Sequence, residues 1–517
     1  MSQSAAIAAG HPKTAKAAKI IIQAGGNAFD AAVAAHLAAC VAEPVLASLG
    51  GGGYLLARHK GQTTLYDFFV QTPRRSISSG VLDFYPITAD FGTTRQEFHI
   101  GAASIAVPGV VKGLFAIQKE LGKLPMTVVA EPAISMARQG INVNAFQAYI
   151  FEVVSPIYHV DPETFATFRS PSRPDQLIQE GEVLTLPKLA DFIEHLALEG
   201  DDWFYEGEVA GKIVDLCRQK GGWLDHPDLA CYQVIRRRPL ALTYRNSRIL
   251  TNPPPSSGGI LIAFALKLLE QFDLSRAQFG EYPYLDLLTR VQEATQRARL
   301  DYDLDETHPD AFPPLLDSNT IARYLARLGS HPLCSRGTTH ISIMDKDGNI
   351  ASLTTSNGEG CGYMIPGTGV ILNNMLGEED LNPHGFHQWQ PNCRMTSMMA
   401  PTLAFLPDSA IALGSGGSNR LRTAILQTLV NLIDFQMPLE EAIQAPRLHF
   451  ENGLLNLENG FPGHAVQELA HHFSNYKQWP GKNLFFGGVH AVQLQAGKFH
   501  GFGDPRRGGA AIAAYKP

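Results

Sequence analysis

A threonine behind a glycine, Gly337-Thr338, carries the clearest candidate chemistry in this chain. It stands just before an apolar strand pattern at 341–344. A Thr that opens a strand after a Gly is common, and its hydroxyl alone is a weak nucleophile. If the chain is cut before Thr338, the freed α-amine can act as the base for the hydroxyl of the same residue. The pair therefore indicates either an N-terminal threonine nucleophile or, more plainly, a hydroxyl at a strand edge.

Two predicted strands, 339–344 and 350–356, follow this threonine, and the end of the second brings polar side chains back to it. Asp347-Gly348, between them, is typical of a two-residue hairpin turn. With that turn, Ser356 lies opposite Thr339 and Asn357 lies opposite Thr338. We expect this hydroxyl and this amide beside the new amino terminus, where they either orient the amine or only satisfy a polar end of the sheet.

A second candidate feature is the glycine turn Gly416-Gly417, between a strand predicted at 410–414 and a helix predicted at 419–436. Adjacent glycines let two backbone N–H groups converge, and the helix dipole adds positive potential there. An oxyanion that forms on an attacked carbonyl needs such donors, each of which lowers the barrier by about 3 kcal/mol. A phosphate cradle uses the same features, but the Gly-Lys-Ser/Thr ending of a P-loop does not follow this turn.

The elements around these residues predict an α+β fold. Because strands and helices mix without regular βα alternation, we expect antiparallel sheets layered with helices. Helices are predicted at 12–24 and 28–41, strands at 49–56 and 65–70, and a mostly helical segment at about 110–330; strands then follow at 339–344, 350–356, 369–373, 402–405, 410–414, 454–457 and 489–494.

Composition argues against several classes of partner. The 517 residues are 45% hydrophobic and 18% charged, with a formal charge of -7 and no block of like charges, so we expect no nucleic-acid partner. The six cysteines form no CxxC pair and no zinc-type spacing with His, so we expect no metal. The first residues lack a basic signal region, and the most apolar run, 31–41, is too short to cross a membrane. We expect a cytoplasmic protein.

Three motifs in the last third of the chain resemble the γ-glutamyltransferase family of N-terminal-nucleophile hydrolases. They are Gly-Thr-Thr-His-x-Ser from residue 337, Asp-x-Asp-Gly-Asn from residue 345, and Pro-Gly-Thr-Gly-x-x-Leu-Asn-Asn from residue 366. Similar landmarks cover nearly the whole chain, at residues 25–32, 50–53, 253–259, 400–402, 414–418, 445–447 and 504–507.

The resemblance implies a four-layer αββα fold and an inactive precursor that cuts itself between Gly337 and Thr338. The products are a large subunit, 1–337, and a small subunit, 338–517, which interleave into one αββα domain. Thr338 then attacks an amide, with its own amine as base. The resemblance also assigns Gly416 and Gly417 to the oxyanion hole. It implies no cofactor.

Further roles come from the same resemblance. Ser356 falls where the family has a Thr that holds the nucleophile, and Thr396-Ser397 occupies the position of a Ser pair beside the substrate carboxylate. A family Leu-Asn, whose Asn contacts substrate, is here Asn357-Gly358, so that contact is displaced or lost. Either Glu378 or Asp380 inherits the family Asp that holds the substrate ammonium.

One departure concerns the substrate carboxylate. The family usually reads Asp-Phe-Arg in its second strand, and that Arg clamps the carboxylate, whereas this chain has Phe69. A Phe cannot make a bidentate, charge-assisted contact. Arg74, Arg75 and Arg394 are candidates to replace the missing cation.

We therefore expect a self-processing hydrolase or transferase that acts on a γ-glutamyl amide or a related acyl amide through an acyl-Thr338 intermediate. Water, or an amino acid or peptide, is the acceptor. Phe69 favours an alternative substrate class, glutaryl-type amides. A third alternative is a family member that no longer processes itself and serves as a binding protein. The oligomeric state stays open, a homo-oligomer included.

Overall fold

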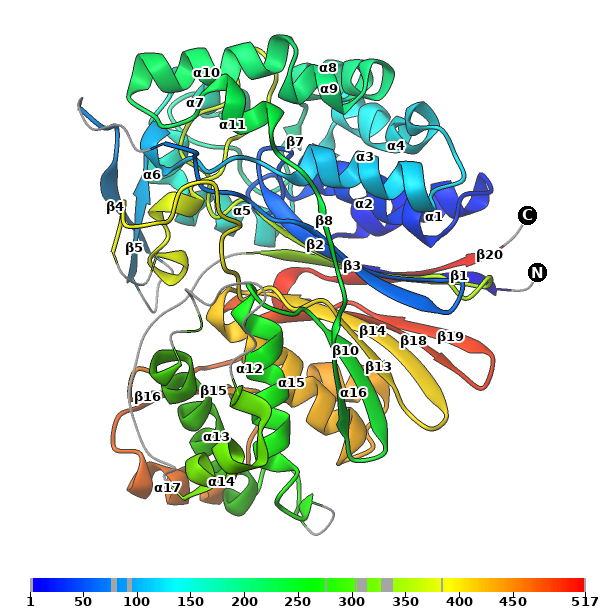
Figure 1. The fold of residues 1–517 in the computed structure, drawn as a ribbon, viewed down its shortest axis with the longest axis vertical. Helices are drawn as coiled ribbons and strands as arrows, with labels where there is room; N and C mark the ends of the chain where they lie inside the picture. Colours follow the sequence, from blue (N-terminus) through cyan, green and yellow to red (C-terminus); the bar gives the residue numbers. More distant parts are fainter. Residues whose placement is uncertain are drawn as a thin grey trace.

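The computed structural model describes residues 3–75, 81–90, 95–274, 277–302, 304, 314–326, 338–382 and 385–515. Two β-sheets stacked face to face lie between an upper and a lower group of helices (Figure 1). The layers therefore run helix, sheet, sheet, helix. This arrangement confirms the α+β class and the four-layer αββα sandwich.

The upper sheet has seven strands, and every neighbouring pair is antiparallel. Its order is β20 (Ala510–Tyr515), β1 (Gln3–Ala9), β11 (Thr339–Asp345), β12 (Ile350–Ser356), β2 (Gly52–His59), β3 (Gln62–Phe68) and β8 (Ile235–Arg237). Strands from both sides of Thr338 are mixed in this sheet, since β1 lies between β20 and β11 and β12 pairs with β2. The predicted division into 1–337 and 338–517 would therefore leave two interleaved chains.

The lower sheet has six antiparallel strands and is likewise built from both sides of Thr338. Its order is β19 (Lys498–Phe502), β18 (Gly488–Gln495), β14 (Ser409–Gly416), β13 (Thr402–Phe405), β10 (Ser247–Thr251) and β9 (Leu240–Tyr244). Smaller sheets pair β4 (Tyr85–Asp90) with β5 (Arg95–Ile100), β6 (Ile141–Asn142) with β7 (Val183–Leu184), and β16 (Leu454–Leu457) with β15 (Leu448–Glu451) and β17 (Tyr476–Gln478).

The upper helices begin with α1 (Pro12–Gln23) and α2 (Ala28–Ala42). Asn27 caps α2, because its side chain accepts from the backbone N–H of Asp30 while the Asp30 carboxylate accepts from that of Asn27. The other upper helices are α3 (Val110–Leu121), α4 (Met126–Gln139), α5 (Ala145–Val153), α6 (Ser155–Tyr158), α7 (Pro162–Phe168), α8 (Pro187–Glu199), α9 (Asp201–Tyr205), α10 (Glu208–Lys220) and α11 (His226–Ala230).

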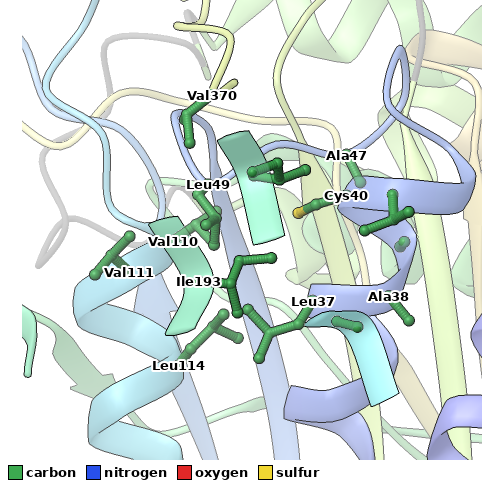
Figure 2. Close-up of a cluster of buried hydrophobic side chains, with 14 of the residues drawn as sticks. Leu37, Ala38, Cys40, Ala47, Leu49, Val110, Val111, Leu114, Ile193 and Val370 are labelled. Atoms are coloured by element: carbon green, nitrogen blue, oxygen red, sulfur yellow. The ribbon is translucent and has the colours of Figure 1, made fainter. Parts of the chain in front are cut away.

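Alternating side chains of β1 show how the sheets divide the core. Ala5 and Ile7 belong to the cluster shared with the upper helices, whereas Ala6 and Ala8 belong to the cluster between the sheets and the lower helices. Within the upper cluster, side chains of α2, α3 and α8 meet, including Leu37, Leu114 and Ile193 (Figure 2). Apolar residues thus hold both sheets in place.

The lower helices pack beneath the second sheet (Figure 1). They are α12 (Ser257–Leu269), α13 (Tyr282–Asp301), α14 (Ser318–Leu325), α15 (Asn419–Ile433), α16 (Leu439–Gln444) and α17 (Gly463–His472). Helix α15 begins directly after β14, so the predicted glycine turn joins the lower sheet to this helix.

One predicted strand is wrong. Residues 369–373 contain only isolated bridges, from Ile371 to Met364 and from Leu372 to Gly50. The backbone turns at Gly367 (φ 78°) and again at Gly369 (φ 75°), and left-handed residues so close together prevent an extended strand from starting there.

Candidate active site

Thr338 immediately precedes β11 and is buried, with 4% of its surface exposed. Gly337, on the other side of the predicted cleavage, lies outside the described residues. The neighbouring Thr339 donates its hydroxyl to the carboxylate of Glu43 (2.9 Å), which also accepts from Thr14 (2.7 Å). Burial raises the pKa of that carboxyl group. These bonds tie the start of β11 to the upper helices.

The predicted hairpin register is wrong by one residue. Thr339 pairs with Thr355, and continuing this pairing places Thr338 level with Ser356 rather than with Asn357. The loop holds three residues, because the Asp345 carboxylate accepts from the backbone N–H of residues 347 and 349 and Gly348 is left-handed (φ 80°). The corrected register brings Ser356 to Thr338.

The glycine turn lies against the candidate nucleophile. Gly416 ends β14, and its backbone is so close to Thr338 that a Cβ there would overlap the Thr338 carbonyl oxygen. Gly417 follows with φ 119°, a conformation that favours glycine. Helix α15 begins two residues later, so the positive end of its dipole lies near Thr338. Of the two predicted oxyanion-hole residues, Gly416 therefore lies against the threonine, and Gly417 is the next residue of the same turn, near Arg507 and Gly487.

A buried arginine that we did not predict for the site also contacts Thr338. Arg507 donates from Nη1 to the Thr338 carbonyl oxygen (3.2 Å) and from Nη2 to the Leu484 carbonyl oxygen (3.4 Å). Burial, with the charge of nearby Arg420, lowers the pKa of Arg507 to about 10. We noted residues 504–507 in the sequence only as a family landmark, because no local pattern shows which strand end they meet.

A small pocket, partly open to solvent, adjoins Thr338 and Ser356. Three of the five predicted substrate-binding residues line it: Glu378, Asp380 and Ser397. Its other lining residues are Phe69, Met375, Leu381, Met398, Met399, Ser418 and Leu421. The pocket therefore offers a hydroxyl-bearing end, an acidic side and an apolar wall.

The two other predicted substrate-binding residues are not among those that line this pocket. Thr396 donates its hydroxyl to the carbonyl oxygen of Pro255 (2.9 Å), which is a structural contact. Asn357 follows Ser356 and is buried, with 1% of its surface exposed. Its role in substrate binding stays a prediction.

The acidic residues of the pocket are held in place. The Asp380 carboxylate accepts from the hydroxyl of Ser418 (2.8 Å) and from the amide of Asn419 (3.2 Å), both at the start of α15. Arg299 donates to the main-chain carbonyl of Asp380 (2.9 Å). Glu378 is 5% exposed. The structure brings both acids to the pocket, so it does not choose between them.

None of the three predicted replacement arginines lines the pocket. Arg74 and Arg75 are exposed. Arg394 is buried behind Phe69, where its guanidinium donates to the Phe69 carbonyl oxygen and to the Tyr232 hydroxyl. Its charge is thus directed away from the pocket.

The described residues contain neither a cluster that could hold a metal ion nor a helix that could cross a membrane. No group of three or more His, Cys, Asp or Glu side chains there is arranged to hold a metal ion. No helix in that part of the chain is long and apolar enough to cross a membrane.

An αββα sandwich in which a strand-opening threonine meets a glycine turn defines the N-terminal-nucleophile hydrolase class. The structure superimposes on cephalosporin acylase from Bacillus halodurans with a TM-score of 0.85 at 24% identity, over 100% of this chain and 96% of that one. It also matches gamma-glutamyltranspeptidase from Pseudomonas nitroreducens, with a TM-score of 0.53 at 26% identity, over 62% and 92%.

Sequence comparison leads to the family. The family model for gamma-glutamyltranspeptidase matches residues 14–514. The Acylase ACY 1 proenzyme of Pseudomonas sp. (strain SE83) is 32% identical over 89% of this chain and 85% of its own length. The glutathione hydrolase proenzyme of Escherichia coli (strain K12) is 31% identical over 85% and 80%. The chain belongs to the gamma-glutamyltranspeptidase family and is an enzyme of that family, which confirms the resemblance seen in the sequence.

Proposed function

We propose that this protein cleaves itself before Thr338 and then acts as an amide hydrolase through an acyl-Thr338 intermediate. The observation that carries the proposal is the position of Thr338, level with Ser356, against the Gly416 backbone and at the edge of the pocket. The names of its relatives support self-processing, because both the acylase and the glutathione hydrolase are proenzymes.

In the proposed maturation, Thr338 Oγ attacks the carbonyl carbon of Gly337. The bond from that carbon to the Thr338 nitrogen breaks, and the nitrogen takes a proton and becomes a free α-amine. Water then hydrolyses the resulting ester, so that the carboxylate leaves with Gly337 and the hydroxyl of Thr338 is restored. The products, 1–337 and 338–517, stay together through the shared sheets.

In the proposed turnover, the α-amine of Thr338 accepts the proton of its own hydroxyl as Oγ attacks the substrate amide carbon. Backbone N–H groups of the Gly416-Gly417 turn stabilise the negative oxygen that develops. The protonated amine then gives its proton to the leaving nitrogen. Water attacks the acyl-Thr338 ester and releases a carboxylic acid. Ser356 orients the nucleophile.

The acyl-amide reading has a specific observation in its favour over a strict γ-glutamyl reading. Phe69 lines the pocket, and Arg394 does not line it but donates to the Phe69 carbonyl oxygen. Relatives of both kinds, an acylase and glutathione hydrolases, match the chain. A rebuilt acyl pocket on retained catalytic machinery accounts for both findings.

Denaturing electrophoresis and amino-terminal sequencing test the proposal. Purified protein should give two fragments of about 37 and 20 kDa, at roughly 110 Da per residue, and the smaller should begin Thr-Thr-His-Ile. Thr338→Ala should give a single band near 56.2 kDa and no amidase activity. Thr338→Ser, which keeps a hydroxyl, should still be cut. Wild-type protein that stays intact would favour the binding-protein alternative.

A further inference from the structure

The pocket beside Thr338 carries negative but no positive side chains among its described lining residues. Glu378 and Asp380 form one side. The apolar part of the lining consists of Phe69, Met375, Leu381, Met398, Met399 and Leu421. No Lys, Arg or His belongs to the described lining. Among the described residues, a bound acyl group therefore meets carboxylates, hydrocarbon and hydroxyls, but no cation.

Hydrogen bonds hold the Asp380 carboxylate in place at the pocket. Asp380 is anchored through its carboxylate by Ser418 and Asn419 and through its main chain by Arg299. Two donors on a carboxylate leave further lone pairs that can accept from a ligand. A carboxylate held in a partly buried pocket attracts a cationic group and repels an anionic one more strongly than it would in water.

The positive charges near the apolar wall are committed elsewhere. Arg394 and Arg237 both form ion pairs with the fully buried Asp67, at 3.4 and 2.8 Å. Asp67 lies two residues before Phe69, whose ring stacks on Tyr54 at 5.5 Å. Phe69 thus lines the pocket, whereas neither Arg394 nor Arg237 belongs to its described lining.

We propose that the acyl group carried by Thr338 ends in an ammonium group and bears no carboxylate, as in a 4-aminobutyryl amide. The proposal rests on the acyl-Thr338 function above and names its substrate class. The ammonium meets Glu378 and Asp380, while the methylene chain lies along the methionine and leucine wall. An added carboxylate would find no cation among the described lining residues, because Phe69 stands where the family has its Arg and only hydroxyls such as that of Ser397 remain to contact it.

Four p-nitroanilide substrates test the amine and the carboxylate of the acyl group separately. The γ-glutamyl group carries both an amine and a carboxylate, the 4-aminobutyryl group only the amine, the glutaryl group only the carboxylate, and the butyryl group neither. We expect kcat/KM for the 4-aminobutyryl anilide, corrected for release without enzyme, to exceed each of the others at least about tenfold, with the glutaryl anilide slowest. Processed enzyme that prefers the γ-glutamyl or glutaryl anilide, or fails to prefer the 4-aminobutyryl one, overturns the inference.

Variants assign the preference to residues. Asp380→Asn and Glu378→Gln should each lower the ratio of 4-aminobutyryl to butyryl turnover about tenfold, whereas Glu379→Gln, an exposed neighbour outside the pocket, should leave it unchanged. Testing both acids keeps the result readable if one variant fails to fold. An unchanged ratio in the folded acid variants contradicts the proposal.

Phe69→Arg places an arginine at the position where the family has one. Phe69→Arg should raise γ-glutamyl relative to 4-aminobutyryl turnover about tenfold, because it supplies the carboxylate contact. A folded variant with an unshifted ratio counts against the inference. The two proposals fail separately: uncut, inactive wild-type protein contradicts the proposed function, whereas cut protein that favours carboxylate-bearing acyl groups contradicts only the substrate class.

Discussion

Arg507 donates a hydrogen bond to the carbonyl oxygen of Thr338, 3.2 Å away, from a segment that lies 169 positions later in the chain. The segment is rigid, because Asp504 accepts from the backbone N–H of Arg506 and forms an ion pair with Arg447 (2.8 Å). Burial raises the pKa of Asp504, but the positive charges of Arg447 and Arg506 outweigh this effect and lower the pKa to about 2. A buried charged cluster thus positions the residue that anchors the nucleophile.

Arg507→Gln should slow both self-cleavage and turnover. A hydrogen bond from a charged donor contributes about 1.5–3 kcal/mol, so kcat should fall about 10- to 100-fold. Because Arg507 is not among the residues lining the acyl pocket, KM should change little. Arg507→Lys keeps a positive charge but lacks the planar guanidinium, so its kcat should lie between that of the wild type and that of Arg507→Gln.

The control for Arg507 is Arg218→Gln, which removes an exposed arginine that pairs with Asp215 on the same helix. It should leave kcat and cleavage unchanged. A large rise in KM with unaltered kcat in Arg507→Gln would show that this arginine binds substrate and does not position Thr338.

Gly416→Ala should abolish cleavage and turnover. A Cβ at this position would overlap the Thr338 carbonyl oxygen, so either the nucleophile or the glycine turn must move. Gly211→Ala is a matched control, because no atom lies within 4 Å of a Cβ added there. In the interior of α10 the same exchange should stabilise the protein by about 0.5–1 kcal/mol. Amino-terminal sequencing and urea unfolding measure both effects, and normal processing in Gly416→Ala contradicts the proposed packing.

Local patterns in the sequence indicated the candidate nucleophile and the glycine turn, and the family resemblance indicated the acidic residues that line the pocket. The hairpin register could not be predicted in the same way, because the three-residue loop depends on the carboxylate of Asp345, which accepts from residues on both sides of Gly348. The one-residue error matters, since side chains alternate between the faces of a sheet. The corrected register places Ser356 beside Thr338.

The apolar lining of the pocket could not be predicted from the sequence either. Phe69 follows β3, Met375 follows an irregular segment, and Met398 belongs to the loop before β13, so only the tertiary fold brings them together. Arg394 was a reasonable candidate for the missing cation by position. The buried Asp67 beside it determines that the guanidinium turns away.

Ser356→Ala should lower kcat about tenfold, because its hydroxyl stands level with Thr338. Its hydroxyl oxygen accepts from the backbone N–H of Gly358 (3.1 Å), so a loss of about 1 kcal/mol of stability should accompany the change. Ser352→Ala is the control on the same strand. That hydroxyl donates to the Leu413 carbonyl (3.1 Å), so stability should fall similarly while kcat holds. Equal kcat in both variants would remove Ser356 from the mechanism.

His36 should make the stability of the fold depend on pH. It lies fully buried in α2, with Nδ1 3.2 Å from the Thr355 hydroxyl, and burial lowers its pKa to about 4 from an ordinary value of 6.5. Between these two values the unfolded chain binds a proton at this residue and the folded chain does not. Stability therefore falls as the pH drops through 6.5 towards 4.

His36→Gln removes this proton linkage, so comparison with the wild type isolates it from the other buried histidines. Between pH 7 and about pH 5 the wild type should lose about 2 kcal/mol of unfolding free energy relative to the variant. The same exchange at the exposed His195 provides the control. Urea unfolding at both pH values measures the difference. A constant difference between wild type and His36→Gln would mean that the folded protein protonates His36 as readily as the unfolded chain does, which its burial between α2 and β12 argues against.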